Sequence, residues 1–430
     1  MIYRKSILEN GSLLIVVPTR SASLVSFMAI IRAGPRFDPQ GKKGLAHFVE
    51  HMIFKGSKNY QTAKILTTKL EKSGIIMKGL TYYDTVRYWI NTRREHWEKG
   101  VSILLDAIKN PLFTSKEVEK EKKIVLEERR NLIDNPDELI WEIWSKNFWQ
   151  DSSLEGPYLG TEDTIARFTR EDVFNFWFRN YLARNTVFII AGDLSLNEIK
   201  RQIEHVTLDN KRYSTQTIIP ETPQVRNSAM IYYKDLKNIT VAYGVPTVPI
   251  SHVDRVALEF LVDIFTGGWS SRFYQKIVEK GLAYSIEAYS THLLDTGYFL
   301  IKFQTKPNNL YKTLSIINNE LEKIKKGNLF REEIERAKEY FTTQLLLSTE
   351  TVEAKIDWFA LQDIFGRNKK LISPSQKCKA IQKLLPQDIV KITRRYFNPT
   401  RWFLSLIGPL SPKDIKKMFI KFDTIKEGRI

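Results

Sequence analysis

The sequence is poor in cysteine and has no long apolar run. Its only cysteine is Cys378, so no disulfide can form within the chain, and a lone thiol suits a reducing compartment. The apolar stretches 13–17 and 24–31 are strand-sized, whereas a membrane-spanning helix needs about 20 apolar residues. Residues 1–11 also lack the apolar core of a secretory signal. We therefore expect a cytoplasmic protein with no membrane partner.

Low-complexity tracts are absent as well, but positive charge is abundant. The 66 Lys and Arg residues exceed the 49 Asp and Glu residues, which gives a net charge of +17. Clustered positive charge would indicate a nucleic-acid or membrane partner. Here the basic residues alternate with glutamates along predicted helices, as in 117–123, which is typical of solvated helix surfaces. We predict no nucleic-acid partner.

An internal repeat organises the chain. The sequence Gly192–Ile199 recurs as Gly408–Ile415, an offset of 408 − 192 = 216 residues. Each copy follows a predicted helix that ends in tyrosine and then an apolar strand, so the repeat favours a duplicated α/β unit. The polar, proline-containing stretch 211–227 has the composition of a linker. We assign residues 1–210 to an N-terminal domain and 228–430 to a C-terminal domain of the same fold.

The order of the predicted elements indicates the fold class. In the second half, residues 229–233, 240–245 and 298–303 have strand patterns, and 310–326 and 331–347 have helical ones. Strands precede long helices without regular βαβ alternation. The sequence therefore predicts an α+β protein of two duplicated domains, each a mainly antiparallel sheet with helices packed on one face.

A helical segment, residues 44–56, carries three polar side chains among nonpolar ones. His47, Glu50 and His51 stand at i, i+3 and i+4, so they share one face, and burying them without a partner would be costly. This H-x-x-E-H pattern suits a zinc ion bound by both histidines, with the glutamate acting on a water as general base. The alternative is two core histidines that only hydrogen-bond to Glu50. We predict one Zn²⁺ per chain. Because the repeat offset places no such motif in the second half, we expect residues 1–210 to be the catalytic domain and 228–430 to be noncatalytic.

A zinc site for hydrolysis needs a third protein ligand. The capping box Thr114–Glu117 begins a helix that should end at residues 134–136. Its inward stripe, read in steps of three and four, consists of Val118, Glu121, Val125, Glu128 and Leu132. Carboxylates on such a stripe need a charge partner, which makes Glu128 the expected ligand and Glu121 a supporting group behind the ligands. The alternative is that both lie on an exposed face.

With these residues in place, the sequence resembles the pitrilysin and mitochondrial-processing-peptidase family of zinc metallopeptidases, in its short-chain branch. The matching segments are Leu8–Gly11, Ala33–Gly34, Gly44–His47, Phe54–Gly56, Asn110–Phe113, Val125–Glu128, Ala191–Asp193 and Glu333–Lys338. The resemblance implies that Glu128 is the third zinc ligand and that Glu121 supports it. It also implies two domains per chain and a homodimer or heterodimer whose chamber admits unfolded peptide substrates.

Two positions depart from the family pattern. Lys78 stands where the family usually has an asparagine that holds the substrate backbone. Of the family's Arg and Tyr pair, which binds the scissile carbonyl region, Tyr284 is present, but the arginine position falls near Ile277 or Val278. The resemblance implies a zinc-dependent endopeptidase with Glu50 and Tyr284 as catalytic residues.

Two other functions compete with this interpretation. The first is a low-activity or noncatalytic scaffold subunit that needs a partner chain to supply the Arg/Tyr pair. The second is a nucleic-acid module with structural zinc, which a single cysteine disfavours because closed structural sites are usually rich in cysteine.

Overall fold

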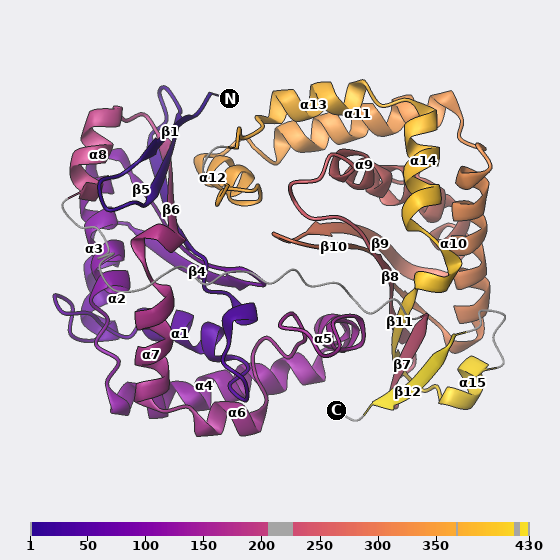
Figure 1. Cartoon of the computed structure of the whole chain (residues 1–430), viewed down its shortest axis with the longest axis horizontal. Coiled ribbons are helices and arrows are strands. Elements are labelled where there is room, and N and C mark those ends of the chain that lie inside the picture. The colour runs from indigo at the N-terminus through magenta and orange to yellow at the C-terminus, as the bar shows by residue number, and fades with distance from the viewer. Residues whose placement is uncertain (1, 205–226, 367–368, 417–421, 429–430) are drawn as a thin grey trace. The chain divides into compact units, whose positions relative to one another are not determined.

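The structure is a computed structural model, and it describes residues 2–204, 227–366, 369–416 and 422–428 (Figure 1). The chain forms two compact units, and neither is one continuous segment. The first unit consists of Met1–Arg130, Pro157–Ile219 and Ser348–Pro374; the second consists of Asn131–Gly156, Pro220–Leu347 and Ser375–Ile430. The predicted linker, 211–227, lies outside the described residues except for Asn227.

The first unit is built on a six-stranded sheet with the order β1-β2-β6-β3-β5-β4. Its strands are β1 (Arg4–Ile7), β2 (Leu13–Pro18), β3 (Leu24–Ile31), β4 (Ile76–Tyr82), β5 (Thr85–Arg93) and β6 (Thr186–Gly192). All neighbours pair antiparallel except β2 and β6. Among the residues that the structure describes, β4 is last in the order and pairs with β5 alone, so it forms a free edge of the sheet.

Helices cover both faces of this sheet. The helices of the unit are α1 (Leu45–Ile53), α2 (Ala63–Glu71), α3 (Trp97–Lys109), residues 115–130 of α4 (Ser115–Asp134), α6 (Glu162–Arg167), α7 (Arg170–Asn180), α8 (Leu196–Glu204) and α12 (Val352–Ala360). One face, with Phe27 and Tyr88, packs in the core formed with α1, α3 and α7. On the other face, Ile356 and Phe359 of α12 pack in a second core with Met28 of β3 (Figure 1).

The second unit repeats this plan. Its sheet has the order β12-β7-β11-β8-β10-β9. Its strands are β7 (Ser228–Tyr233), β8 (Ile239–Pro246), β9 (Ala283–His292), β10 (Gly297–Thr305), β11 (Phe403–Gly408) and β12 (Thr424–Gly428). Its helices are α5 (Pro136–Phe148), α9 (Arg255–Thr266), α10 (Leu310–Lys325), α11 (Arg331–Leu347), α13 (Pro374–Gln382), α14 (Pro386–Tyr396) and α15 (Pro412–Lys416). Helix α5 packs on β7, β8 and β11.

The predicted fold class, α+β with two similar units, is confirmed. The strand orders match position by position from β2-β6-β3-β5-β4 to β7-β11-β8-β10-β9, and the repeated segments span the end of β6 to α8 and the end of β11 to α15. The arrangement differs from the prediction in one respect. Each sheet has a helix on its second face as well, and that helix comes from the other half of the sequence: α12 in the first unit and α5 in the second.

No helix in the described part of the chain is long and apolar enough to cross a membrane. This agrees with the strand-sized apolar runs of the sequence.

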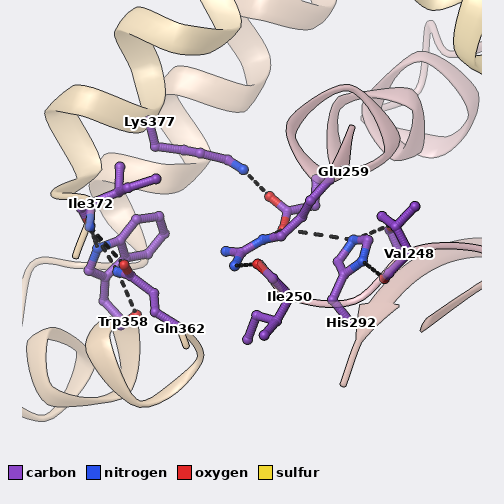
Figure 2. A network of polar contacts seen from close by, with 10 residues as sticks. Val248, Ile250, Glu259, His292, Trp358, Gln362, Ile372 and Lys377 are labelled. Atoms are coloured by element: carbon purple, nitrogen blue, oxygen red, sulfur yellow. Dashed lines mark hydrogen bonds and ion pairs between the residues drawn. The ribbon is translucent and has the colours of Figure 1, made fainter. Parts of the chain in front are cut away.

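A buried polar network holds α13 against α9 in the second unit (Figure 2). Lys377 and His292 approach the Glu259 carboxylate from opposite sides, and Lys377 pairs with it. The Nδ1–H of His292 donates to the Val248 carbonyl over 2.8 Å, and its Nε2 atom faces the Ser290 hydroxyl at 2.9 Å. Burial lowers the pKa of His292 to about 4, so the imidazole is neutral at physiological pH.

We predict that His292 makes the folded state sensitive to acid. Its pKa is lower in the folded than in the unfolded chain, so the unfolded chain binds more protons between about pH 4 and 6.5. The stabilisation is complete above pH 6.5 and is lost as the pH falls through that window. The loss should be about 3 kcal/mol. His292→Asn should remove this dependence, as measured by urea unfolding at pH 7 and 4.5.

The difference between wild type and His292→Asn is the quantity to compare. Burial raises the pKa of Asp38 and Asp263 to about 7, so these two groups change stability in the opposite direction over the same window. Equal loss of stability in both proteins on acidification would contradict the assignment to His292.

Candidate metal centre

Helix α1 is held in the core of the first unit by its apolar side chains. Its Leu45, Phe48, Val49 and Met52 side chains are buried in that core. The Asp38 carboxylate caps its first turn, because one oxygen accepts from the Gly44 backbone N–H and the other from the Ala46 N–H, each over 2.8 Å. The rotation of α1, and with it the direction of its polar side chains, is therefore set by packing.

The three predicted ligands lie together. One ligand atom from each of His47, His51 and Glu128 falls within 4.8 Å of the other two, and no other such group was found among the residues described by the structure. Nε2 of His47 is 3.7 Å from one Glu128 oxygen, and Nε2 of His51 is 3.5 Å from the other. These separations exceed a hydrogen bond but match the spacing of about 3.4 Å between two ligands of a tetrahedral zinc ion.

Glu121 orients His51 from behind. His51 Nδ1 donates to one Glu121 oxygen over 2.8 Å, which leaves its Nε2 lone pair directed toward Glu128. Lys55 pairs with the second Glu121 oxygen at 2.6 Å. Burial alone would raise the pKa of Glu121, but the hydrogen bonds and charges of His51 and Lys55 lower it. Glu121 is thus an ionised, buried carboxylate of the kind that fixes the tautomer of a metal-binding histidine.

The two histidines differ in their proton affinity. Burial, together with the neighbouring His51, lowers the pKa of His47 to about 3, so its imidazole is neutral and available to a metal. Its Nδ1 atom is buried and has no hydrogen-bond partner among the residues that the structure describes. Burial opposes the charged form of His51 too, but the Glu121 hydrogen bond and three nearby carboxylates raise its pKa. The set of two imidazoles and one carboxylate fits a zinc ion.

Glu50 lies beside the ligands and is held by the edge strand β4. The Thr81 hydroxyl donates to one Glu50 oxygen over 2.8 Å. A Cβ atom on Gly79 would stand 2.3 Å from the other oxygen, so only glycine lets the strand pass this close. Glu50 is only 8% exposed, and burial raises its pKa. A carboxyl group with a raised pKa is suited to proton transfer near neutral pH.

The other predicted residues have different surroundings. Glu128 is partly exposed, at 44% of its side chain, whereas the next residue, Arg129, is buried. Tyr284 is the second residue of β9 in the second unit, and it is 84% exposed. Ile277 and Val278 belong to a π-helical turn, Tyr274–Val278, and neither provides a polar side chain.

Sequence reasoning missed three residues of the site. Lys55 lies one turn after His51 on the same helical side, so the i, i+4 spacing was a usable signal. Gly79 and Thr81 are about 30 residues away in sequence, and only the pairing of β4 with β5 brings them to Glu50.

Comparison with known protein families identifies the class of protein to which the chain belongs. Residues 14–162 match the family described as Insulinase (Peptidase family M16), and residues 167–341 match the Peptidase M16 inactive domain. The chain therefore belongs to the insulinase family of metallopeptidases, and the resemblance to pitrilysin and processing peptidases is confirmed.

Individual relatives span nearly the whole chain. An uncharacterized zinc protease of Rickettsia bellii is 29% identical over 95% of this chain and 98% of its own length. The beta subunit of the mouse (Mus musculus) mitochondrial-processing peptidase is 22% identical over 94% of this chain and 84% of its own length. The crystal structure of a protease from Helicobacter pylori has a TM-score of 0.88 at 22% identity and covers 95% of this chain and 99% of its own. This last likeness establishes the fold.

We predict that Glu121→Gln weakens zinc binding about tenfold or more without unfolding the chain, because His51 loses the carboxylate that fixes its tautomer. Competition with a chromophoric chelator measures the affinity. Glu127→Gln on the same helix is the matched control, since Glu127 pairs with Arg130 on the exposed side. Equal affinities for the two variants would contradict a supporting role for Glu121.

Proposed function

We propose that this chain is a zinc-dependent endopeptidase that hydrolyses unfolded peptides or peptide extensions. The observation that supports it best is the convergence of His47, His51 and Glu128 next to a buried Glu50. The relatives named zinc proteases support the same chemistry. When bound, zinc supplies a Lewis acid that activates water and polarises a carbonyl.

The residues of the chain then divide the remaining work. His47, His51 and Glu128 hold the metal, and Glu121 keeps His51 in the binding tautomer. Glu50 accepts a proton from the attacking water and returns it to the leaving amine, while Thr81 fixes the carboxylate for both transfers. The free edge of β4 passes Glu50 and can pair with an extended peptide. We propose that Tyr284, or its counterpart on a partner chain, stabilises the oxyanion.

A partner chain is part of a second candidate function. Ile277 is fully buried and Val278 is apolar, so no donor stands at the family's arginine position. This favours a heterodimer in which a related but different chain supplies the Arg/Tyr pair, because a second copy of this chain would lack the same arginine. A homodimer, which could supply only a second Tyr284, stays a prediction from the family resemblance, and a low-activity or scaffold subunit is the alternative. The mitochondrial relative is itself named as a subunit. The cytoplasmic location expected from the single cysteine stays a prediction.

The test is the zinc content of the purified chain together with its cleavage of a mixed library of unstructured peptides, before and after dialysis against a chelator. Zinc with chelator-sensitive cleavage supports a self-sufficient peptidase. Zinc without cleavage favours the chain that needs a partner, and absence of zinc favours the scaffold.

Substituting Glu50 and Glu128 one at a time tests their different roles. Glu50→Gln should keep zinc bound and lower cleavage by at least about a hundredfold, because it removes the base but no ligand. Glu128→Gln should lower the zinc content itself. Zinc content and peptide turnover are measured on the same samples. Equal zinc loss in both variants would refute the assignment of Glu50 as the base and Glu128 as a ligand.

Gly79→Ala tests the close approach of β4. The added methyl group must displace Glu50, so we expect reduced turnover with an unchanged zinc content. Gly74→Ala is a useful comparison for stability alone, because nothing lies near a Cβ atom there, although its φ of +61° strains any other residue. Retention of full activity by Gly79→Ala would show that Glu50 does not depend on this contact.

A further inference from the structure

The edge strand β4 presents different chemistry on its two faces. Gly79 and Thr81 point to the α1 side and contact Glu50. Alternate residues point to the α12 side and are exposed, with Ile76 at 57% and Leu80 at 46%. Lys78 lies between these two apolar side chains, directly opposite Trp89 of β5 in the pairing register. Lys78 is therefore one residue from the point where the strand contacts the proposed base, but on the other face.

The Lys78 side chain is held in place yet accessible. Its Nζ atom lies 3.0 Å from Glu353 on α12 and 5.7 Å from the centre of the Trp89 ring. Its side chain is 48% exposed, and the ammonium carries three N–H donors, of which the Glu353 oxygen accepts one. The cation thus has a defined position, and within the described part of the chain its other donors remain for a ligand.

Glu353 does not depend on Lys78 for its own position. It also accepts hydrogen bonds from Trp89 Nε1 and Asn91 Nδ2, each over 2.7 Å. These donors and Lys78 together lower the pKa of Glu353 against the effect of burial. An exposed ion pair contributes at most about 1 kcal/mol to stability, so stability alone is a weak explanation for this arrangement. Its clearer effect is positional: Trp89 and Asn91 hold the Glu353 carboxylate, and the carboxylate holds the Lys78 ammonium at the sheet edge.

A peptide that adds to this edge would meet both faces. Its side chains would alternate between the Glu50 side and the Lys78 side, and a residue directly opposite Lys78 would place its Cβ about 5 Å away. A carboxylate on that residue reaches the ammonium. The peptide residues two positions before and after it would lie over Ile76 and Leu80.

We propose that Lys78 is a specificity-determining residue that selects a peptide with Asp or Glu flanked, at alternate positions, by apolar residues. This inference rests on the proposed peptidase function, and it names the substrate class of that same site. The net charge of +17 favours the same peptides, because a positive protein attracts acidic ligands over long range.

The test uses two fluorescent unstructured peptides that differ only in Glu or Gln at the central position of an apolar-x-Glu-x-apolar pattern. Binding is measured by anisotropy on the zinc-loaded full chain carrying Glu50→Gln, so that no turnover occurs. Lys78→Met, Lys78→Arg and Glu353→Gln are each added to that background. Cleavage of a peptide library by the chain with Glu50 intact, with and without Lys78→Met, supplies the second readout.

We expect the Glu peptide to bind on the order of fivefold more tightly than the Gln peptide, with the difference shrinking as salt is raised. Lys78→Met should abolish the difference, and Lys78→Arg should keep it. Glu353→Gln should leave it at least as large, because the ammonium loses a competing anion. In the library, acidic residues should be enriched at one fixed distance from the cleaved bond, and Lys78→Met should remove this enrichment.

The outcomes separate this inference from the proposed function. Cleavage without acidic enrichment, equal binding of both peptides, binding of neither, or a Glu preference that survives Lys78→Met would each overturn the role of Lys78. A Lys78-dependent preference in binding, together with no cleavage of any peptide by the zinc-loaded chain, would instead support the subsite and count against the peptidase.

Discussion

The fixed orientation of α1 is the constraint on which the rest of the site depends. The helix is packed on nearly all sides, so its three polar side chains have little access to water and each needs a polar partner close by. His51 is satisfied by Glu121, Glu50 by Thr81, and both histidines face Glu128. The sheet and helices of the first unit thereby hold a preorganised set of donors whose shared need is a cation.

Strand β4 has two roles in the first unit: it contacts Glu50, and it provides an edge with which a peptide can pair. Strand β4 brings Gly79 and Thr81 to Glu50, and no strand in the described part of the chain pairs with its outer side. An exposed edge is usually a liability, and Lys78 at its middle is the kind of residue that discourages unspecific pairing between sheets. We infer that the charge of Lys78 disfavours pairing between sheets of two chains and, under the specificity proposed above, also selects the peptides that pair with this edge.

The fold class, the repeat and the proximity of His47, His51 and Glu128 could be predicted from the sequence, because each prediction depends on local patterns of residue spacing. The helix stripe that selected Glu121 and Glu128 needs only 3.6 residues per turn. Helical spacing alone did not predict that Arg129 would be buried and Glu128 partly exposed. The exposure of a residue at the border of the inward-facing side depends on which neighbouring elements cover it. Thr81, Gly79 and Glu353 were beyond reach for a related reason, because their contacts arise from strand pairing and helix placement across long separations.

Helix α12 comes from the second half of the sequence but packs in the first unit, and α5 comes from the first half but packs in the second unit. Neither half of the sequence therefore contains all the residues of its own core. Without α12 and the segment that follows it, the first sheet would expose the face that Ile356, Phe359, Ile364 and Leu371 now cover. Burying four such side chains is worth roughly 6–12 kcal/mol, as much as a typical domain's entire stability. The two halves are therefore expected to be obligate complements. Polypeptides 1–210 and 228–430 made separately should each be insoluble or unfolded, yet assemble when produced together, as the fragments of a split protein do.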